Sequence, residues 1–228
     1  MTQFNHVPVE LQELSAEQVQ GDRIYTTPNG KFYPSVTTVL SQHSKEGIMQ
    51  WRKQVGEETA NKISRQAAVR GTKFHNMAEQ YLKNSLGDEN LSLLDKEIFN
   101  IAKPELNKIN NIRALEAPLY SDHLRLAGRV DCVAEYEGKL SIIDFKTSRR
   151  EKQKEHILHY FMQASAYAIM FEERTNIPIV NLTIIIAVDD GFTQTFQSKR
   201  DNFVEGLLHY RDLYELENRN SLNNKSQV

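Results

Sequence analysis

The chain is poor in cysteine, with Cys132 the only one among 228 residues. A single thiol excludes an intrachain disulfide. It also excludes an iron–sulfur cluster bound by this chain alone, because such clusters need several thiolates. Cys132 lies in a run of strand-forming residues, and we expect it to be a small core residue.

Charge excess, apolar runs and targeting patterns are missing as well. The formal net charge of −2 gives no global attraction to nucleic acid, so contact with nucleic acid would require a local basic groove. No run approaches the ~18 apolar residues of a membrane span. The N-terminus has no signal pattern and is acidic where a transit peptide would be basic. We therefore expect a soluble protein with no membrane partner, in a bacterial or virus-infected host cytoplasm, although the sequence does not identify the compartment.

The length favours one domain. We expect it to span residues 23–216, after a loosely ordered segment over residues 1–22. Residues 217–228 are rich in Asn and Ser, which predicts a disordered tail. There is no Gly-Lys-Ser/Thr phosphate-binding loop, so the chain is not itself a helicase.

The most informative stretch is a predicted β-hairpin over residues 130–146. Strand-forming residues flank Glu137-Gly138, which can form a two-residue turn. The residue numbers of paired residues then sum to 275, which places Asp131 opposite Asp144. Two opposed carboxylates repel each other, so a sheet that carries them needs a cation there. Lys146 projects from the same face as Asp144.

Two carboxylates and a lysine in this arrangement suit phosphate chemistry. Carboxylate oxygens are ligands for Mg²⁺ or Mn²⁺. A nearby ammonium group can hold an anionic phosphate and the attacking water. An acid-x-Lys pattern is common by itself, and a surface hairpin with scattered charges is the alternative interpretation.

The other elements are expected to surround this hairpin. Asn29-Gly30 predicts a second hairpin, and Ser35 can cap a following helix. Helical spacing runs over residues 48–55, with Trp51 as a core residue, and over residues 57–84, where Gly71 indicates a kink or a helix junction. Further predicted elements are helices over residues 91–111, 157–173 and 203–214 and strands over residues 114–120 and 180–188.

His75 and Glu79 lie four residues apart and therefore share one face of the long predicted helix. Glu116 lies on the predicted strand that precedes the hairpin. A structural histidine and an exposed strand carboxylate are the alternatives to roles in a site.

Taken together, these stretches resemble the PD-(D/E)XK nuclease superfamily, in its RecB-type branch, and are most similar to the mitochondrial genome maintenance exonuclease family. The stretches that carry the resemblance are Tyr33-Pro34-Ser35-Val36-Thr37-Thr38-Val39-Leu40, Arg70-Gly71-Thr72-Lys73-Phe74-His75 with Glu79, Arg113-Ala114-Leu115-Glu116, the hairpin, and Gln163 with Tyr167. They extend from about residue 33 to residue 170.

The resemblance implies an α/β fold with a restriction-endonuclease-like core, in which helices flank a central mixed β-sheet. It also implies a helical insertion that arches over the active site, which we place at residues 91–111. Residues 23–216 would then form a single nuclease domain. The implied activity is that of a Mg²⁺- or Mn²⁺-dependent exonuclease acting on single-stranded DNA.

Site roles follow from the same resemblance. The metal ligands would be Asp131, Asp144, the Phe145 backbone carbonyl and His75, with Glu116 and Glu79 as further candidates, and Lys146 would act in catalysis. Glu79 could instead orient His75. Residues expected to contact DNA or support the site are Ser35, Thr37, Arg129, Thr147, Ser148, Arg149, Arg150, Gln163 and Tyr167. An ordinary solvated loop is the alternative for Arg149 and Arg150. A duplex or flap endonuclease of the same superfamily and a non-catalytic DNA-end-binding module are the alternative functions.

Overall fold

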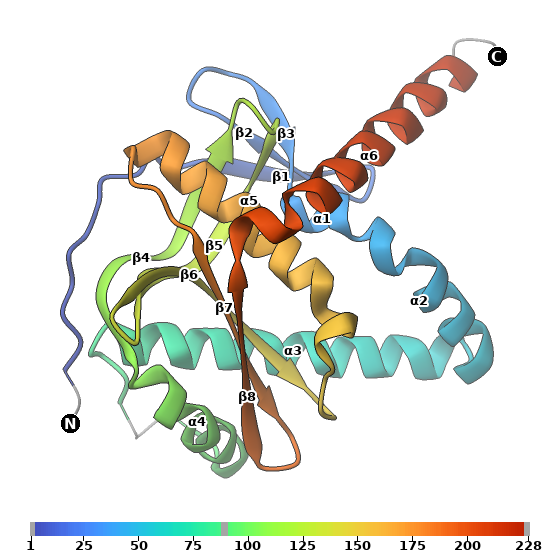
Figure 1. Cartoon of the computed structure of the whole chain (residues 1–228). Coiled ribbons are helices and arrows are strands. Elements are labelled where there is room, and N and C mark those ends of the chain that lie inside the picture. The colour runs from blue at the N-terminus through green and yellow to red at the C-terminus, as the bar shows by residue number, and fades with distance from the viewer. Residues whose placement is uncertain (1–2, 88–90, 226–228) are drawn as a thin grey trace.

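The computed structural model describes residues 3–87 and 91–225, with side chains described as far as residue 218. Its centre is a five-stranded mixed sheet in the order β4-β5-β6-β7-β8. The strands are β4 (Ile109–Ser121), β5 (Leu126–Tyr136), β6 (Lys139–Ser148), β7 (Asn181–Val188) and β8 (Phe192–Lys199). Only the β6–β7 pair is parallel within this sheet. The predicted mixed sheet flanked by helices is therefore confirmed (Figure 1).

The β5–β6 hairpin has the predicted turn and register. Glu137 and Gly138 have φ values of 49° and 75°, the left-handed conformations that a two-residue hairpin turn of this kind requires. Pairing runs from Tyr136–Lys139 to Cys132–Ile143, and every pair sums to 275. Cys132 is fully buried, as expected. The acidic residues lie immediately beyond this ladder.

Helices cover both faces of the sheet. α5 (Leu158–Thr175) connects the parallel strands β6 and β7 and packs on one face together with α1 (Val36–Leu40). α3 (Glu57–Leu82) and α4 (Leu93–Leu106) bury apolar side chains on the other face. β7 is buried along almost its whole length, which explains its continuous apolar sequence. Two short 3₁₀ turns, η2 (Lys154–Ile157) and η3 (Arg200–Phe203), precede α5 and α6 (Val204–Lys225).

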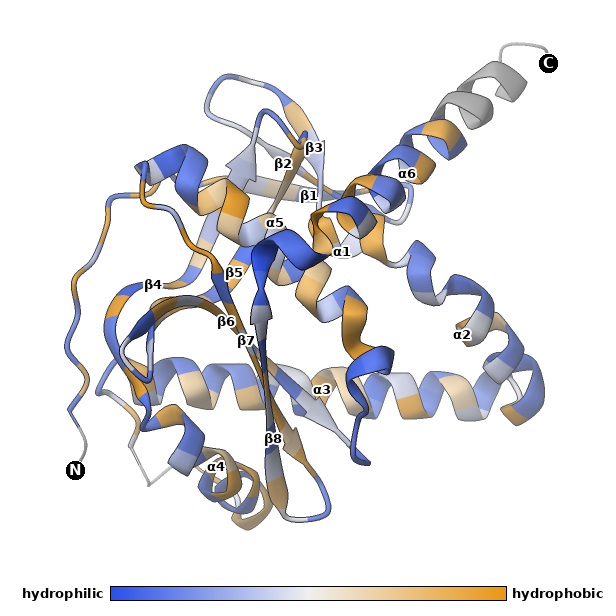
Figure 2. Cartoon of the chain, viewed as in Figure 1, coloured by the Kyte–Doolittle hydropathy of each residue, from blue (hydrophilic) through white to orange (hydrophobic). Residues whose placement is uncertain are grey.

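The long helix α3 differs from its prediction in two respects. It passes through Gly71 as one continuous helix, so the expected kink or helix junction is wrong. Its C-terminal half buries Phe74, Met77 and Ala78, whereas Ala67 and most of the preceding half are exposed. Figure 1 shows this exposed half extending beyond the sheet towards α2 (Gln42–Val55). α2 has no buried residue, so the prediction of a core Trp51 is wrong, and the helix is largely hydrophilic in Figure 2.

α4 does not form the expected arch. The predicted helix over residues 91–111 is shorter, and β4 already begins at Ile109. Phe99, Ala102 and Leu106 are buried in the core beneath α3 and β7. The amphipathic spacing that identified the helix thus serves packing against the sheet. The exposed helices beside the sheet are instead α2 and the N-terminal half of α3.

The N-terminal segment is attached to the fold, contrary to the expectation of a loosely ordered stretch. Phe4 is buried against the core, and its backbone N–H donates to Asn84 Oδ1 at 2.9 Å. His6 forms a parallel β-bridge with Ile112. β1 (Ser15–Val19) pairs with β2 (Asp22–Thr26), which pairs with β3 (Phe32–Pro34) around the predicted Asn29-Gly30 turn.

The C-terminal expectation also changes. α6 continues as far as Lys225, so residues 217–225 are helical where a disordered tail was predicted. Residues 226–228 lie outside the described part of the chain. Among the described residues, no helix is both long enough and apolar enough to cross a membrane.

Candidate active site

The candidate site lies where β5 and β6 separate beyond their shared ladder. Asp131 Oδ2 accepts the Phe145 backbone N–H at 2.8 Å, so a side chain replaces the strand-to-strand bond there. Both acidic side chains are buried, with Asp131 8% and Asp144 1% exposed. The β5–β6 hairpin therefore brings the two predicted acids, Asp131 and Asp144, together. The Phe145 carbonyl remains a predicted ligand, while its ring packs edge-on against Phe74 of α3.

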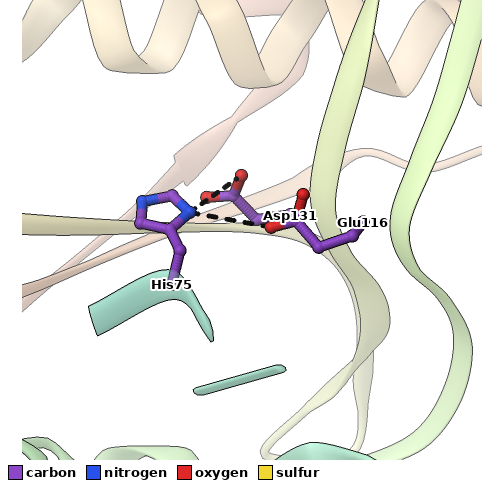
Figure 3. A group of neighbouring side chains, drawn as sticks. All are labelled: His75, Glu116 and Asp131. Atoms are coloured by element: carbon purple, nitrogen blue, oxygen red, sulfur yellow. Dashed lines mark ion pairs between the residues drawn. The ribbon is translucent and has the colours of Figure 1, made fainter. Parts of the chain in front are cut away.

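His75 approaches these strands from the middle of α3. Its Nδ1 atom lies 3.5 Å from Asp131 Oδ1 and 3.7 Å from Glu116 Oε1. Figure 3 shows the imidazole pointing at both carboxylates, which come from neighbouring strands. One potential ligand atom from each of the three residues lies within 4.8 Å of the others. Segments 15 to 56 residues apart in sequence thus supply a compact set of nitrogen and oxygen donors.

Glu116 has an unusual backbone conformation. Its φ of 45° is left-handed, which is uncommon for a residue other than glycine. Regular pairing with β5 holds on both sides, at Leu115–Cys132 and Ala117–Val130. Arg129 donates a short hydrogen bond to the Glu116 backbone carbonyl. Strain of this kind costs on the order of 1–3 kcal/mol and persists where the surroundings hold it. Here it accompanies a carboxylate directed at His75.

Asp144 and Lys146 form a buried ion pair on the α5 side of β6. Lys146 Nζ lies 2.6 Å from Asp144 Oδ1 and 2.5 Å from Oδ2. Burial raises the pKa of Asp144 to about 6; Lys146 opposes this increase, and the nearby Asp131 carboxylate adds to it. Burial would lower the pKa of Lys146, but Asp144 and Asp131 raise it overall. The lysine therefore stays charged at neutral pH beside two acids.

His75 and Asp131 also hold each other in their charged forms. Burial alone would lower the pKa of His75, yet the neighbouring carboxylates of Asp131 and Glu116 raise that pKa to about 10. Burial would raise the pKa of Asp131, but His75, Lys146 and the Phe145 N–H bring it below its usual value. The protonated imidazole of His75 thus supplies positive charge beside the carboxylates of Asp131 and Glu116.

The donor set fits a hard divalent cation. Mg²⁺ and Mn²⁺ favour carboxylate oxygens, whereas imidazole nitrogen is more typical of the later transition metals, so the carboxylates are the main donors for a hard cation here. Asp131, Glu116 and His75 offer these atoms close together, and Asp144 is near enough for the charges of Asp131 and His75 to act on its carboxyl. A divalent cation would compensate the clustered carboxylates more fully than a single imidazolium. We therefore regard these four residues as the candidate metal ligands.

Glu79 is close to the site but outside the three-residue cluster. Its carboxylate pairs with Lys83 at 2.6 Å. It lines a cavity of about 500 Å³ together with His75, Glu116 and Arg129. Of its two predicted roles, neither has direct support, because the structure pairs Glu79 with Lys83 rather than with His75.

Gln163 and Tyr167 lie on α5 and face β5. The Gln163 amide approaches the Tyr167 hydroxyl at 3.4 Å. A Cβ atom at Gly128 would lie 2.8 Å from the Tyr167 ring, so only glycine allows this close approach. Tyr167, which is 3% exposed, thus packs against β5, the strand that carries Asp131, and its role in supporting the site or contacting DNA stays a prediction.

The other predicted DNA contacts divide into buried and exposed groups. Ser35 is buried and caps α1 by accepting the Thr38 N–H at 2.9 Å, whereas Thr37 is exposed. Ser148 donates to the Arg150 carbonyl at 2.7 Å, so its hydroxyl shapes the loop. Further residues at this end of β6 are Thr147, which accepts from Arg70 Nε at 3.4 Å, and the exposed Arg149 and Arg150.

One residue beside the site was not identified from the sequence. Tyr160 lies on α5, and Lys146 Nζ is 5.1 Å from the centre of its ring. Tyr160 precedes Gln163 by three positions, so the two share a helix face. That spacing is the sequence signal that could have identified it.

Comparisons with known proteins find similarity to nucleases. Residues 99–205 match the family described as the PD-(D/E)XK nuclease superfamily. The chain is 31% identical to human mitochondrial genome maintenance exonuclease 1 over 173 residues, and 29% identical to the mouse protein over 175 residues. Each match covers 69% of this chain and 50% of the relative, so the chain spans about half the length of these curated relatives.

A solved structure of a Eubacterium rectale protein described as a candidate exonuclease superposes with a TM-score of 0.47 and 14% identity, covering 66% of this chain and 65% of that one. The family and relative matches include the strands that carry the acidic residues and Lys146. The chain is therefore similar to the PD-(D/E)XK nuclease superfamily over residues 99–205, and it is homologous to the mitochondrial genome maintenance exonucleases.

Proposed function

We propose that this protein is a divalent-metal-dependent deoxyribonuclease that degrades single-stranded DNA from a free end. The observation that carries the proposal is the convergence of His75, Glu116 and Asp131 within 4.8 Å, next to the Asp144–Lys146 pair. This arrangement combines a cation site with a fixed ammonium group. The relatives are named as exonucleases, which supports the choice of an exonuclease.

Each site residue has a role in the proposed hydrolysis. Asp131, Asp144, His75 and Glu116 would hold the ion, which when bound supplies Lewis-acid activation of water and neutralises charge on the phosphate. Lys146 would position the attacking water and stabilise the developing negative charge. Since Lys146 is already fixed by Asp144, little reorganisation is needed during the reaction.

The charge distribution supports a nucleic-acid path beside this site. Residues 42–73, which form α2 and most of the exposed half of α3, contain seven Lys or Arg and three Asp or Glu. The whole chain has a net charge of −2, so positive charge is concentrated on these helices. Phosphate contacts of this kind supply affinity without sequence preference. We therefore place the incoming strand between these helices and the α5 side of the sheet.

The test is a digestion time course with Mg²⁺ on end-labelled linear single strands. We expect the wild type to shorten the strand progressively from an end, and Asp144→Ala to retain no more than a few per cent of the turnover. Asp212→Ala is the matched control because this acid is exposed on α6 and distant in sequence from the site. Equal activity of wild type and Asp144→Ala would overturn the assignment of the site.

A closed single-stranded circle tests the requirement for an end. If a strand must pass between α2–α3 and α5 from a terminus, the circle should persist while a linear strand of the same sequence is consumed. Rapid nicking of the circle would favour the endonuclease alternative. The site assignment would survive that result, because both modes use the same carboxylates and lysine.

A further inference from the structure

A row of aromatic side chains leads away from Lys146 across three helices. Tyr160 packs against His159 with ring centres 4.1 Å apart, and His159 stacks on His43 at 5.2 Å. His43 then meets Tyr210 edge-on at 5.4 Å. These rings come from α5, α2 and α6, and we call the row of Tyr160, His159, His43 and Tyr210 the aromatic ladder.

The ladder is only partly covered by protein. All of its residues are of intermediate exposure, in contrast to the fully buried Phe161 next to Tyr160. His159 Nδ1 is buried and forms no hydrogen bond among the described residues. An unsatisfied buried nitrogen costs stability, and an apolar ring would pack there without that cost. Helix packing alone therefore explains the histidine poorly.

The charge state of the aromatic ladder also suits stacking. Burial, together with His43, Lys146 and Lys152, lowers the pKa of His159 to about 4, so its imidazole is neutral at physiological pH. Lys146 Nζ lies over the face of Tyr160, at the end of the ladder nearest the candidate site. A nucleotide whose phosphate is held by Lys146 would therefore carry its base close to these rings.

We propose that the aromatic ladder binds the unpaired bases of the strand next to the scissile phosphate by stacking. This inference rests on the proposed function and extends it from phosphate chemistry to the choice of substrate. Every base has an aromatic face, so such a surface grips single strands without sequence preference. A duplex already stacks its bases on one another and cannot offer them to the ladder.

The test measures binding without cleavage. Fluorescence anisotropy in EDTA would compare a labelled oligothymidylate with a strand of the same length that lacks bases. We expect the wild type to bind the oligothymidylate more tightly. His159→Ala and His43→Ala should each weaken that binding by about 5- to 160-fold, the range for losing one base stack, and leave the baseless strand unchanged.

Two further variants separate stacking from folding. His159→Phe keeps a ring and should restore the preference for bases. His123→Ala removes an exposed histidine outside the ladder and should behave as wild type. If the wild type prefers the oligothymidylate and both alanine variants retain the full preference, the ladder proposal is wrong and the proposed function stands. Failure of the wild type to bind either strand would overturn both.

Discussion

Replacing Asp144 with asparagine should stabilise the protein freed of divalent ions, even though it removes a proposed metal ligand. Asp144 is buried beside Asp131, and its pKa rises from 3.8 to about 6 in the folded chain. Because the folded chain holds this proton more tightly, stability is lost as the pH rises from about 4 to about 6. Once the carboxyl is ionised in both states, it destabilises the fold by about 3 kcal/mol.

Urea unfolding in EDTA measures the difference in free energy of unfolding between wild type and Asp144→Asn. Part of the cost is already present at about pH 4.5, so the advantage of Asp144→Asn over wild type should grow by about 2 kcal/mol between about pH 4.5 and pH 7.5. Asp212→Asn is the control, since its side chain is 67% exposed and its curve should run parallel to that of wild type. If the free energy of unfolding changes with pH in the same way for wild type and Asp144→Asn, burial does not raise the pKa of Asp144 and the reasoning is refuted.

Three further predictions concern the neighbouring side chains. Lys146→Ala should abolish turnover but preserve manganese binding in calorimetry, and lost metal affinity would contradict a purely catalytic role. Binding of Mn²⁺ near pH 8 should release about one proton from His75, whose pKa is about 10 without metal, and His75→Ala should abolish this release. A binding enthalpy independent of the buffer would exclude His75 as a ligand. Arg149→Ala with Arg150→Ala should reduce the salt dependence of single-strand binding by about 1.4 in log–log slope, and an unchanged slope would identify a solvated loop.

Local sequence signals predicted the centre of the molecule well. Glu137-Gly138 determined the turn, and the turn determined the register that brings the two acids together, because hairpin pairing follows directly from loop length. His75 and Glu116 required the family resemblance, since their proximity to Asp131 depends on how α3 and β4 pack. Tyr160 was missed although its helical spacing from Gln163 was visible in the sequence.

The incorrect predictions share a physical cause, which is that distant contacts outweighed local composition. The polar N-terminal segment is held by bonds to residues about 80 to 105 positions away, such as Asn84 and Asn110. The lysine-bearing helix α4 uses Phe99 and Leu106 to pack in the core, so it cannot arch over the site. The exposed helical face belongs instead to α3, whose N-terminal half has no sheet beneath it (Figure 1).

The central claim is that the acids and His75 hold a divalent ion at the end of the β5–β6 hairpin. The most direct measurement is an anomalous difference map from a manganese-soaked crystal. We predict a strong peak contacting Asp131, Asp144 and His75 Nδ1 at metal–ligand distances of roughly 2 Å. A map with no peak there, from crystals of an enzyme that cleaves DNA at the same manganese concentration, would contradict the account.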